Sequence, residues 1–379
     1  MTFSLISPFA TPDPRLPIRQ GAPQLTRPDK EDSESFSVEA QQLLANNWAA
    51  QKSLLEAGQY DLRWLEGRHV LLAGATGPGL GGALETAIMG LGTAASVTVV
   101  ARDLSLSLGY ETGRAMQAQA DAMGWGQRFH WLNEGMSMFG KSLENIIVAL
   151  KEAGADRVVY FNTVAAALSG LLPGMPPVYI KDYDETGLFQ WQLTYLTEKE
   201  TGITKHVMGE LAVEFPRILE ENDITVEAAV FADWRGSLDK ASRDPNLREY
   251  GRQGAYSTSL FMPKDILQEY TRAMIGSGKV VQDIFYPMMR TRALPLIPGG
   301  VMIANLNETL MKKEGVRRPD VPELAVAALD KVGKGLTEGY DNPFPRLDSH
   351  DIFLDEWLFE ISARLNDDED SEFYYKRWV

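Results

Sequence analysis

Two patterns of apolar and polar residues alternate along this chain. Short apolar runs predict buried strands, and segments whose apolar side chains recur every three or four residues predict amphipathic helices. The predicted strands cover residues 70–73, 97–101, 128–132, 156–161, 224–231 and 280–289. The predicted helices cover residues 35–65, 104–123, 141–153, 189–221, 263–275, 306–313 and 323–336. This alternation predicts an α/β fold, a Rossmann-type doubly wound parallel sheet with helices on both faces.

Proline and glycine set expectations for individual elements. Gly202 and Pro216 are expected to bend or interrupt the helix over residues 189–221, and Pro263 is expected in the first turn of its helix. The composition along the chain also predicts its division into parts. We expect an N-terminal arm over residues 1–34, a large central domain with an inserted region over residues 35–365, and an acidic C-terminal tail over residues 366–379.

A glycine-rich turn joins the first of these strands to the helical segment that follows. It reads GATGPGLGG over residues 74–82, and its spacing differs from the usual GxGxxG. Glycine lets the backbone approach a pyrophosphate, and a helix start supplies free N–H groups and the positive end of a dipole. Strand, glycine turn, helix and strand together indicate a dinucleotide-binding unit. The predicted contacts in this turn are Gly74, Thr76, Gly77, Gly79 and Leu80.

Two charged residues after the strand over residues 97–101 bear on the choice of dinucleotide. The carboxylate of Asp103 would bind the adenosine ribose hydroxyls and favour NADH. The guanidinium of Arg102 would pair with the 2′-phosphate of NADPH. Because Arg102 comes first after the strand, we expect NADPH, with NADH as the alternative. A solvent-facing ion pair between the two residues is the remaining interpretation.

Composition narrows the chemistry further. The 379 residues carry a net charge of -15, which argues against a nucleic acid or an anionic membrane as the main partner. The absence of cysteine excludes disulfides and thiolate chemistry, and no two of the four histidines have the spacing of a zinc-binding helix. The start of the chain lacks the basic segment of a secretory signal, and the most apolar stretch is broken by Glu85 and glycines. We therefore expect a soluble cytoplasmic protein.

Four collinear stretches resemble the short-chain dehydrogenase/reductases, and most of all the FabV-type trans-2-enoyl-CoA/acyl-carrier-protein reductases. They are GATGPGLGGA, DRVVYFNTVA, MMRTRALPLIPGGVMIANLNETLMKKEG and RLDSHDIFLDEWLFE. The glycine turn is one residue shorter than in that family, and much of the family's insertion before the catalytic tyrosine is missing. The resemblance implies NADPH- or NADH-dependent reduction of an enoyl thioester, free or bound to a carrier protein.

Other functions stay open at this point. A 3-ketoacyl or other carbonyl reductase would use the same residues, and a nucleotide-binding regulator could keep the fold without catalysis. The sequence does not fix the oligomeric state, and a homo-oligomer is compatible with it.

The family's catalytic tyrosine and lysine are separated by eight residues, and this chain offers three candidate pairs. Tyr256 and Lys264 follow the strand over residues 224–231, with seven residues between them. Tyr195 and Lys199 have the shorter spacing of ordinary superfamily members, but they would require residues 177–180 to form the fifth strand. Tyr195 with Lys205 is a third option.

We expect the pair Tyr256 and Lys264, because the topology of this superfamily places the pair at the carboxyl end of a strand. The phenol can donate a hydrogen bond to the oxyanion that forms on the substrate, and the ammonium can support it and hold the nicotinamide ribose. Tyr250 lies in the same predicted loop and could replace Tyr256.

The resemblance also implies further contacts to the dinucleotide. Glu134 or Asn133 would lie near the adenine edge, and Asn162 and Thr163 would lie on the nicotinamide side. Thr291, with the turn over residues 298–300, would cover the carboxamide. No metal site is expected.

Overall fold

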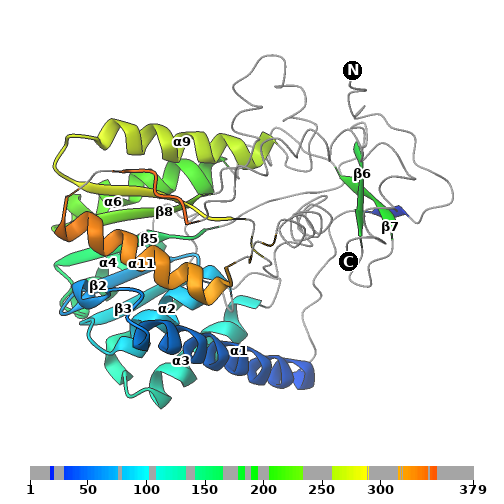
Figure 1. Ribbon diagram of the computed structural model, residues 1–379, viewed down its shortest axis with the longest axis horizontal. Coiled ribbons are helices and arrows are strands. Elements are labelled where there is room, and N and C mark those ends of the chain that lie inside the picture. Colours follow the sequence, from blue (N-terminus) through cyan, green and yellow to red (C-terminus); the bar gives the residue numbers. More distant parts are fainter. Residues whose placement is uncertain are drawn as a thin grey trace.

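The main body of the protein is a six-stranded parallel sheet with helices on both faces (Figure 1). The computed structural model describes residues 18–20, 30–75, 79–101, 108–133, 141–164, 178–183, 189–194, 205–233, 258–287, 289, 315, 317, 319–339 and 342–347. The strand order is β4-β3-β2-β5-β8-β9. These strands are β2 (His69–Ala73), β3 (Ser96–Ala101), β4 (Phe129–Asn133), β5 (Arg157–Asn162), β8 (Thr225–Asp233) and β9 (Val280–Phe285). The predicted Rossmann-type α/β fold is confirmed.

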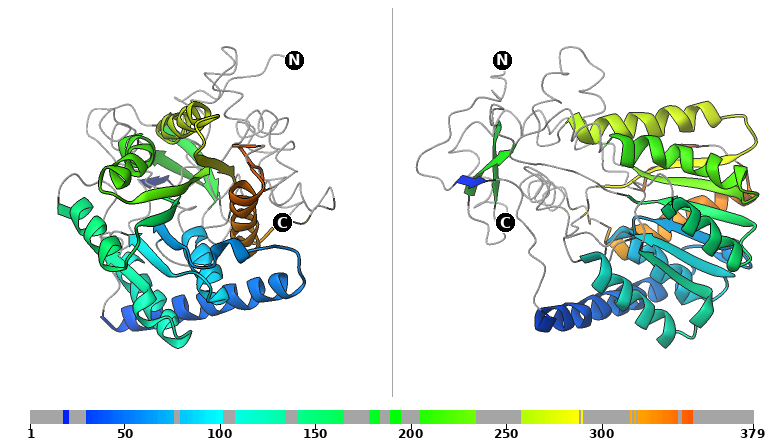
Figure 2. Two further views of the ribbon diagram at one scale, coloured as in Figure 1. Left: turned by 90° about the vertical axis from the view of Figure 1, so that its left-hand side faces the viewer. Right: turned by 180° about the vertical axis from the view of Figure 1, so that it is seen from behind.

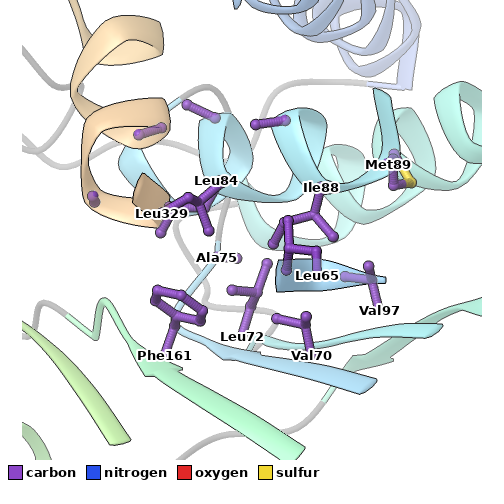
Figure 3. Packing of buried hydrophobic residues seen from close by; sticks show 14 of the residues in the cluster. Leu65, Val70, Leu72, Ala75, Leu84, Ile88, Met89, Val97, Phe161 and Leu329 are labelled. Atoms are coloured by element: carbon purple, nitrogen blue, oxygen red, sulfur yellow. The ribbon is translucent and has the colours of Figure 1, made fainter. Parts of the chain in front are cut away.

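Two hydrophobic clusters, one on each face of the sheet, explain why its strands read as nearly continuous apolar runs. Neighbouring residues of β2 show the division, because Val70 and Leu72 belong to one cluster and Leu71 and Ala73 to the other. Figure 3 shows the first cluster, where Leu72 lies among side chains from the strands and the covering helices. Parallel strands covered on both faces have no solvated side on which polar residues could alternate.

The helices divide between the two faces in the same way (Figure 2). The first cluster takes side chains from α1 (Lys30–Glu56), α2 (Leu80–Leu91), α3 (Leu108–Ala122) and α11 (Val321–Thr337). The second takes side chains from α4 (Lys141–Glu152), α6 (Leu211–Glu221) and α9 (Thr258–Met274).

Helix α1 packs tightly against α2 through one glycine. A Cβ added at Gly90 would lie 1.9 Å from the ring of Trp48, so only glycine lets the indole reach the backbone of α2. Helix α1 ends at Glu56, earlier than residue 65, because Gly58 follows with a φ of 69° and breaks the helix. A separate 3-10 turn covers Arg63–Leu65. The helix also begins inside the predicted arm, although the division of the chain at residue 34 stays a prediction.

The predicted helix over residues 189–221 is wrong in its first part. Phe189–Thr194 forms strand β7, which pairs antiparallel with β6 (Val178–Tyr183) and parallel with β1 (Ile18–Gln20). Apolar and polar residues alternate strictly in the sequence FQWQLT, a period of two that favours a strand. The small sheet lies on the side toward which the strands of the large sheet run (Figures 1 and 2).

The two prolines lie inside helices. Helix α6 is not interrupted at Pro216 and follows a π-helical turn over His206–Glu210, whereas Gly202 lies outside the described residues. Pro263 lies inside α9, because that helix begins at Thr258 and not at residue 263. The predicted helix over residues 306–313 and the acidic tail lie outside the described residues.

Among the helices that the structure describes, none is long and apolar enough to cross a membrane. Within the same residues, no cluster of three or more acidic or histidine side chains could hold a metal ion.

Candidate active site

The loops after β2 and β5 meet at the point where the order of strands in the sheet reverses. From β2 the next strand in the chain, β3, lies on one side, and from β5 the next strand of this sheet, β8, lies on the other side. Thr163 donates its backbone N–H and its hydroxyl to the carbonyl oxygen of Ala73, at 2.8 and 3.1 Å. In open α/β sheets, ligands bind in the crevice beside the carboxyl ends of the strands at this switch point. The predicted residues Gly74, Asn162 and Thr163 therefore come together where a ligand would be expected.

Three glycines of the turn have different roles. Gly74 has a φ of 84°, and a Cβ added there would lie 2.5 Å from the backbone nitrogen of Val164. A Cβ at Gly81 would lie 2.5 Å from the Cα of Ala75. Both glycines are thus required by packing within the protein. Gly79 has a φ of -82°, and no described atom lies within 4 Å of a Cβ built on it, so it faces open space.

The start of α2 presents backbone donors beside Gly79. The first helical hydrogen bond runs from the N–H of Ala83 to the carbonyl oxygen of Gly79, at 3.0 Å. The N–H groups before Ala83 have no partner earlier in this helix, and with the helix dipole they favour an anion. The side chain of Leu80 is buried, so this predicted contact residue can offer only its backbone.

Asn162 is held on both sides by the protein itself. Its Nδ2 donates to the hydroxyl of Tyr160 at 2.7 Å, and its Oδ1 accepts from the N–H of Val164 at 3.0 Å. Burial raises the pKa of the Tyr160 phenol, whose ring packs against Phe215 and Phe231. We conclude that Asn162 shapes the loop after β5 more than it offers its acceptor to a ligand. Tyr160 was missed from sequence, although its position two residues before Asn162 on the same strand face was a usable signal.

Lys264 reaches the same edge of the sheet from α9. Its Nζ donates to the carbonyl oxygen of Ala232 at 2.6 Å, near the carboxyl end of β8. Strand β8 lies next to β5, with Phe231 opposite Asn162. The structure thus brings the predicted lysine to the strand beside the predicted nicotinamide loop.

A buried carboxylate lies beside this lysine. The Oδ1 of Asp233 is 3.6 Å from Lys264 Nζ, and its Oδ2 accepts from Gln268 Nε2 at 3.1 Å. Neither Asp233 nor Gln268 was identified from sequence. The available signals were an aspartate that ends the apolar run of β8 and a glutamine four residues after the lysine, one turn along the helix.

The competing tyrosine–lysine pairs fit the fold less well. Val178–Tyr183 is a strand of the small sheet, whereas the fifth strand of the large sheet is β8, so residues 177–180 do not form that fifth strand. Lys205 forms an ion pair with Glu210 at 2.8 Å and is about half exposed.

Several predicted site residues lie outside the described part of the chain, and their roles stay predictions. They are Tyr256, Tyr250, Tyr195, Lys199, Thr76, Gly77, Arg102, Asp103, Glu134 and Thr291.

Comparison with known proteins gives similarity of fold. No protein-family model and no curated protein sequence match the chain. Among solved structures, the chain is similar to the trans-2-enoyl-CoA reductase of Clostridium acetobutulicum in complex with NADH. The TM-score is 0.60 and the sequence identity is 14%, and the match covers 90% of this chain and 89% of that one. It is also similar to the trans-2-enoyl-CoA reductase of Treponema denticola in complex with NAD, with a TM-score of 0.61, 16% identity and 89% coverage of each chain.

The chain therefore shares the fold of these two trans-2-enoyl-CoA reductases. The match to the FabV-type trans-2-enoyl-CoA reductases, which the sequence resemblance implied, is confirmed at the level of structure.

Proposed function

We propose that this protein is an NAD(P)H-dependent reductase that transfers hydride to the double bond of an enoyl thioester. The observation that carries the proposal is the placement of Lys264. Its ammonium lies at the carboxyl end of β8, on the same sheet edge as Gly79 and the loop after β5. The fold shared with two trans-2-enoyl-CoA reductases supports the choice of substrate.

The described residues fit a dinucleotide. Gly79 faces open space beside the backbone donors of α2, which suits a pyrophosphate. Thr163 would border the nicotinamide, and Lys264 would donate to its ribose hydroxyls. When bound, NADPH or NADH supplies the hydride for the reduction.

The chain's own residues would then stabilise the charge that the reduction creates. Addition of hydride to the β-carbon of an enoyl thioester leaves negative charge on the thioester oxygen. Tyr256 would donate a hydrogen bond to that oxygen, and Lys264 would support the phenol through its ammonium. The α-carbon would then take up a proton from water, which completes the reduction. The same residues would serve reduction of a ketone, so the test must separate the two substrates.

Cofactor preference within the proposal rests on Arg102. A guanidinium at the end of β3 would pair with the 2′-phosphate, which NADPH carries and NADH lacks. The two similar enzymes are complexes with NADH and NAD, so both reduced dinucleotides belong in every assay.

The direct test is oxidation of NADPH and NADH by the purified full chain, followed by absorbance, with crotonyl-CoA and with acetoacetyl-CoA. We expect saturable oxidation with crotonyl-CoA and none above background with acetoacetyl-CoA. Oxidation with acetoacetyl-CoA alone would indicate a carbonyl reductase. Dinucleotide binding without turnover of either thioester would indicate a nucleotide-binding regulator.

A further inference from the structure

The carboxylate of Asp233 lies out of solvent at the carboxyl end of β8. Its side chain is fully buried, whereas the side chain of Lys264 beside it is 18% exposed to solvent. A buried carboxylate is costly unless cations and hydrogen-bond donors surround it. Packing alone does not explain why a carboxylate is buried here. The partly exposed lysine beside it could carry its effect to a ligand at the surface of the protein.

Asp233 is held rigidly by its neighbours. Its carbonyl oxygen accepts from the N–H of Tyr286 at 3.0 Å, which fixes the backbone against the segment after β9. Its Oδ2 accepts from Gln268 Nε2 at 3.1 Å, and the Oε1 of Gln268 accepts from Arg272 Nη2 at 3.3 Å. Because the arginine can only donate, it fixes the orientation of the glutamine amide, with the NH₂ group toward Asp233.

The ammonium of Lys264 is held by two oxygens of the same strand. Its Nζ donates to the carbonyl oxygen of Ala232 at 2.6 Å and lies 3.6 Å from Asp233 Oδ1. The contact with Ala232 is a hydrogen bond, whereas 3.6 Å from Asp233 Oδ1 is an ion-pair distance, so the three N–H bonds of the ammonium are not all used and can donate to a ligand. A long lysine side chain otherwise samples many rotamers, and holding it at one place lowers the entropy lost when it binds a ligand.

We propose that Asp233 is a positioning residue, which holds the ammonium of Lys264 at the carboxyl end of β8. There the ammonium would meet the ribose of a bound dinucleotide. Gln268 in turn holds the carboxylate of Asp233 through its hydrogen bond. This inference rests on the proposed function, because it gives the lysine a dinucleotide to bind. Behind the lysine, the buried side chains of Asp233 on β8 and Gln268 on α9 form the support, and the exposed Arg272, one turn further along α9, holds the glutamine.

The test is titration of NADPH and NADH into the full chain, with the dissociation constant measured by fluorescence for the wild type and its variants. Lys264→Met removes the ammonium, and Asp233→Asn removes the anchoring charge at nearly constant shape. We expect each to weaken binding roughly tenfold. The double variant should bind about as weakly as Lys264→Met alone, because both changes break one interaction.

Asp233→Glu separates positioning from packing. A role in packing alone predicts that the isosteric Asn is mild and the larger Glu is worse. The positioning role predicts the reverse, since Glu keeps a carboxylate that can reach Lys264, so affinity should recover to within a few-fold of the wild type. If Asp233→Asn does not fold, Gln268→Leu weakens the same support from α9 and should lower affinity in the same direction.

Asp330→Asn is the matched control, since Asp330 is a buried aspartate on α11 that pairs with Lys334 at 2.7 Å. Its loss should change the melting temperature without changing dinucleotide affinity. Wild-type affinity in Asp233→Asn, or losses that multiply in the double variant, would overturn the inference alone. A wild-type chain that binds neither dinucleotide would overturn the proposed function and this inference together.

Discussion

Thr163, the first residue after β5, donates twice to the carbonyl oxygen of Ala73, the last residue of β2. The two hydrogen bonds join the carboxyl ends of β2 and β5, the neighbouring strands between which the strand order reverses. A Cβ at Gly74 would strike the backbone of Val164 just beyond, so the two loops are in direct contact. The floor of the candidate site is therefore fixed by backbone contacts, and a ligand need not order it.

Replacement of Thr163 tests this junction. Thr163→Val removes the hydroxyl donor at constant shape and should lower the free energy of unfolding by about 1 kcal/mol. Thr163→Ser keeps the donor and should lose less. Urea denaturation of the three proteins measures the difference, and equal losses for valine and serine would show that the hydroxyl bond does not contribute.

Gly79 and Gly81 should respond differently to a side chain. Gly79→Val places a Cβ in open space with a permitted φ, so the fold should survive while dinucleotide binding weakens by roughly tenfold or more. Gly81→Val drives a Cβ into Ala75 and should lower the melting temperature. Thermal melts and fluorescence titration check both. Unchanged dinucleotide affinity in a folded Gly79→Val protein would rule out this turn as the pyrophosphate site.

Arg102→Ala tests cofactor choice. Loss of a guanidinium that pairs with the 2′-phosphate should weaken NADPH binding roughly tenfold to a hundredfold and leave NADH binding nearly unchanged. Titration of the variant with each dinucleotide provides the comparison, with Arg102→Lys as a control that keeps charge but loses the bidentate geometry. Equal losses for both dinucleotides would show that another residue discriminates.

Glu85 makes stability depend on pH. This carboxyl is fully buried in α2, where burial raises its pKa well above the usual 4.5, and Thr86 donates to it at 3.1 Å. A raised pKa means that the folded chain holds the proton more tightly than the unfolded chain. Its contribution to stability is therefore fully present below pH 4.5 and is lost as the pH rises through the folded-state pKa.

Glu85→Gln removes this titration while keeping the shape of the side chain. The variant should match the wild type in stability near pH 4 and exceed it increasingly as the pH rises above 4.5. Denaturant unfolding across that pH range measures the difference. Two parallel stability curves would show that the carboxyl is not held protonated by burial.

The large sheet could be predicted because its strands are apolar on both faces. Runs such as VVYF in β5 and AAVF in β8 have no other stable place than the interior of an α/β layer. The strand β7 was missed because FQWQLT is short and merges with the apolar positions of the helix after it. An alternation of apolar and polar residues over six positions is a weaker signal than a helical pattern that extends over residues 189–221.

The site could be predicted only in part. The glycine turn and Lys264 follow from local sequence and a resemblance in spacing. The approach of Asp233 to Lys264 does not, because 30 residues separate them and their contact depends on how α9 packs against the end of β8. For the same reason, sequence could not distinguish Gly79, which faces open space, from Gly74 and Gly81, which the packing of the protein itself requires.

We propose that the catalytic residues lie at the carboxyl end of β8. Turnover of crotonyl-CoA by the Tyr256→Phe variant tests this most directly. The change removes one hydroxyl and little volume, so dinucleotide affinity should stay near the wild-type value. Turnover should fall roughly a hundredfold or more through loss of oxyanion stabilisation, and Tyr195→Phe as a control should change it little. Full turnover in Tyr256→Phe together with a large loss in Tyr195→Phe would contradict the account and move the reacting phenol to the other pair.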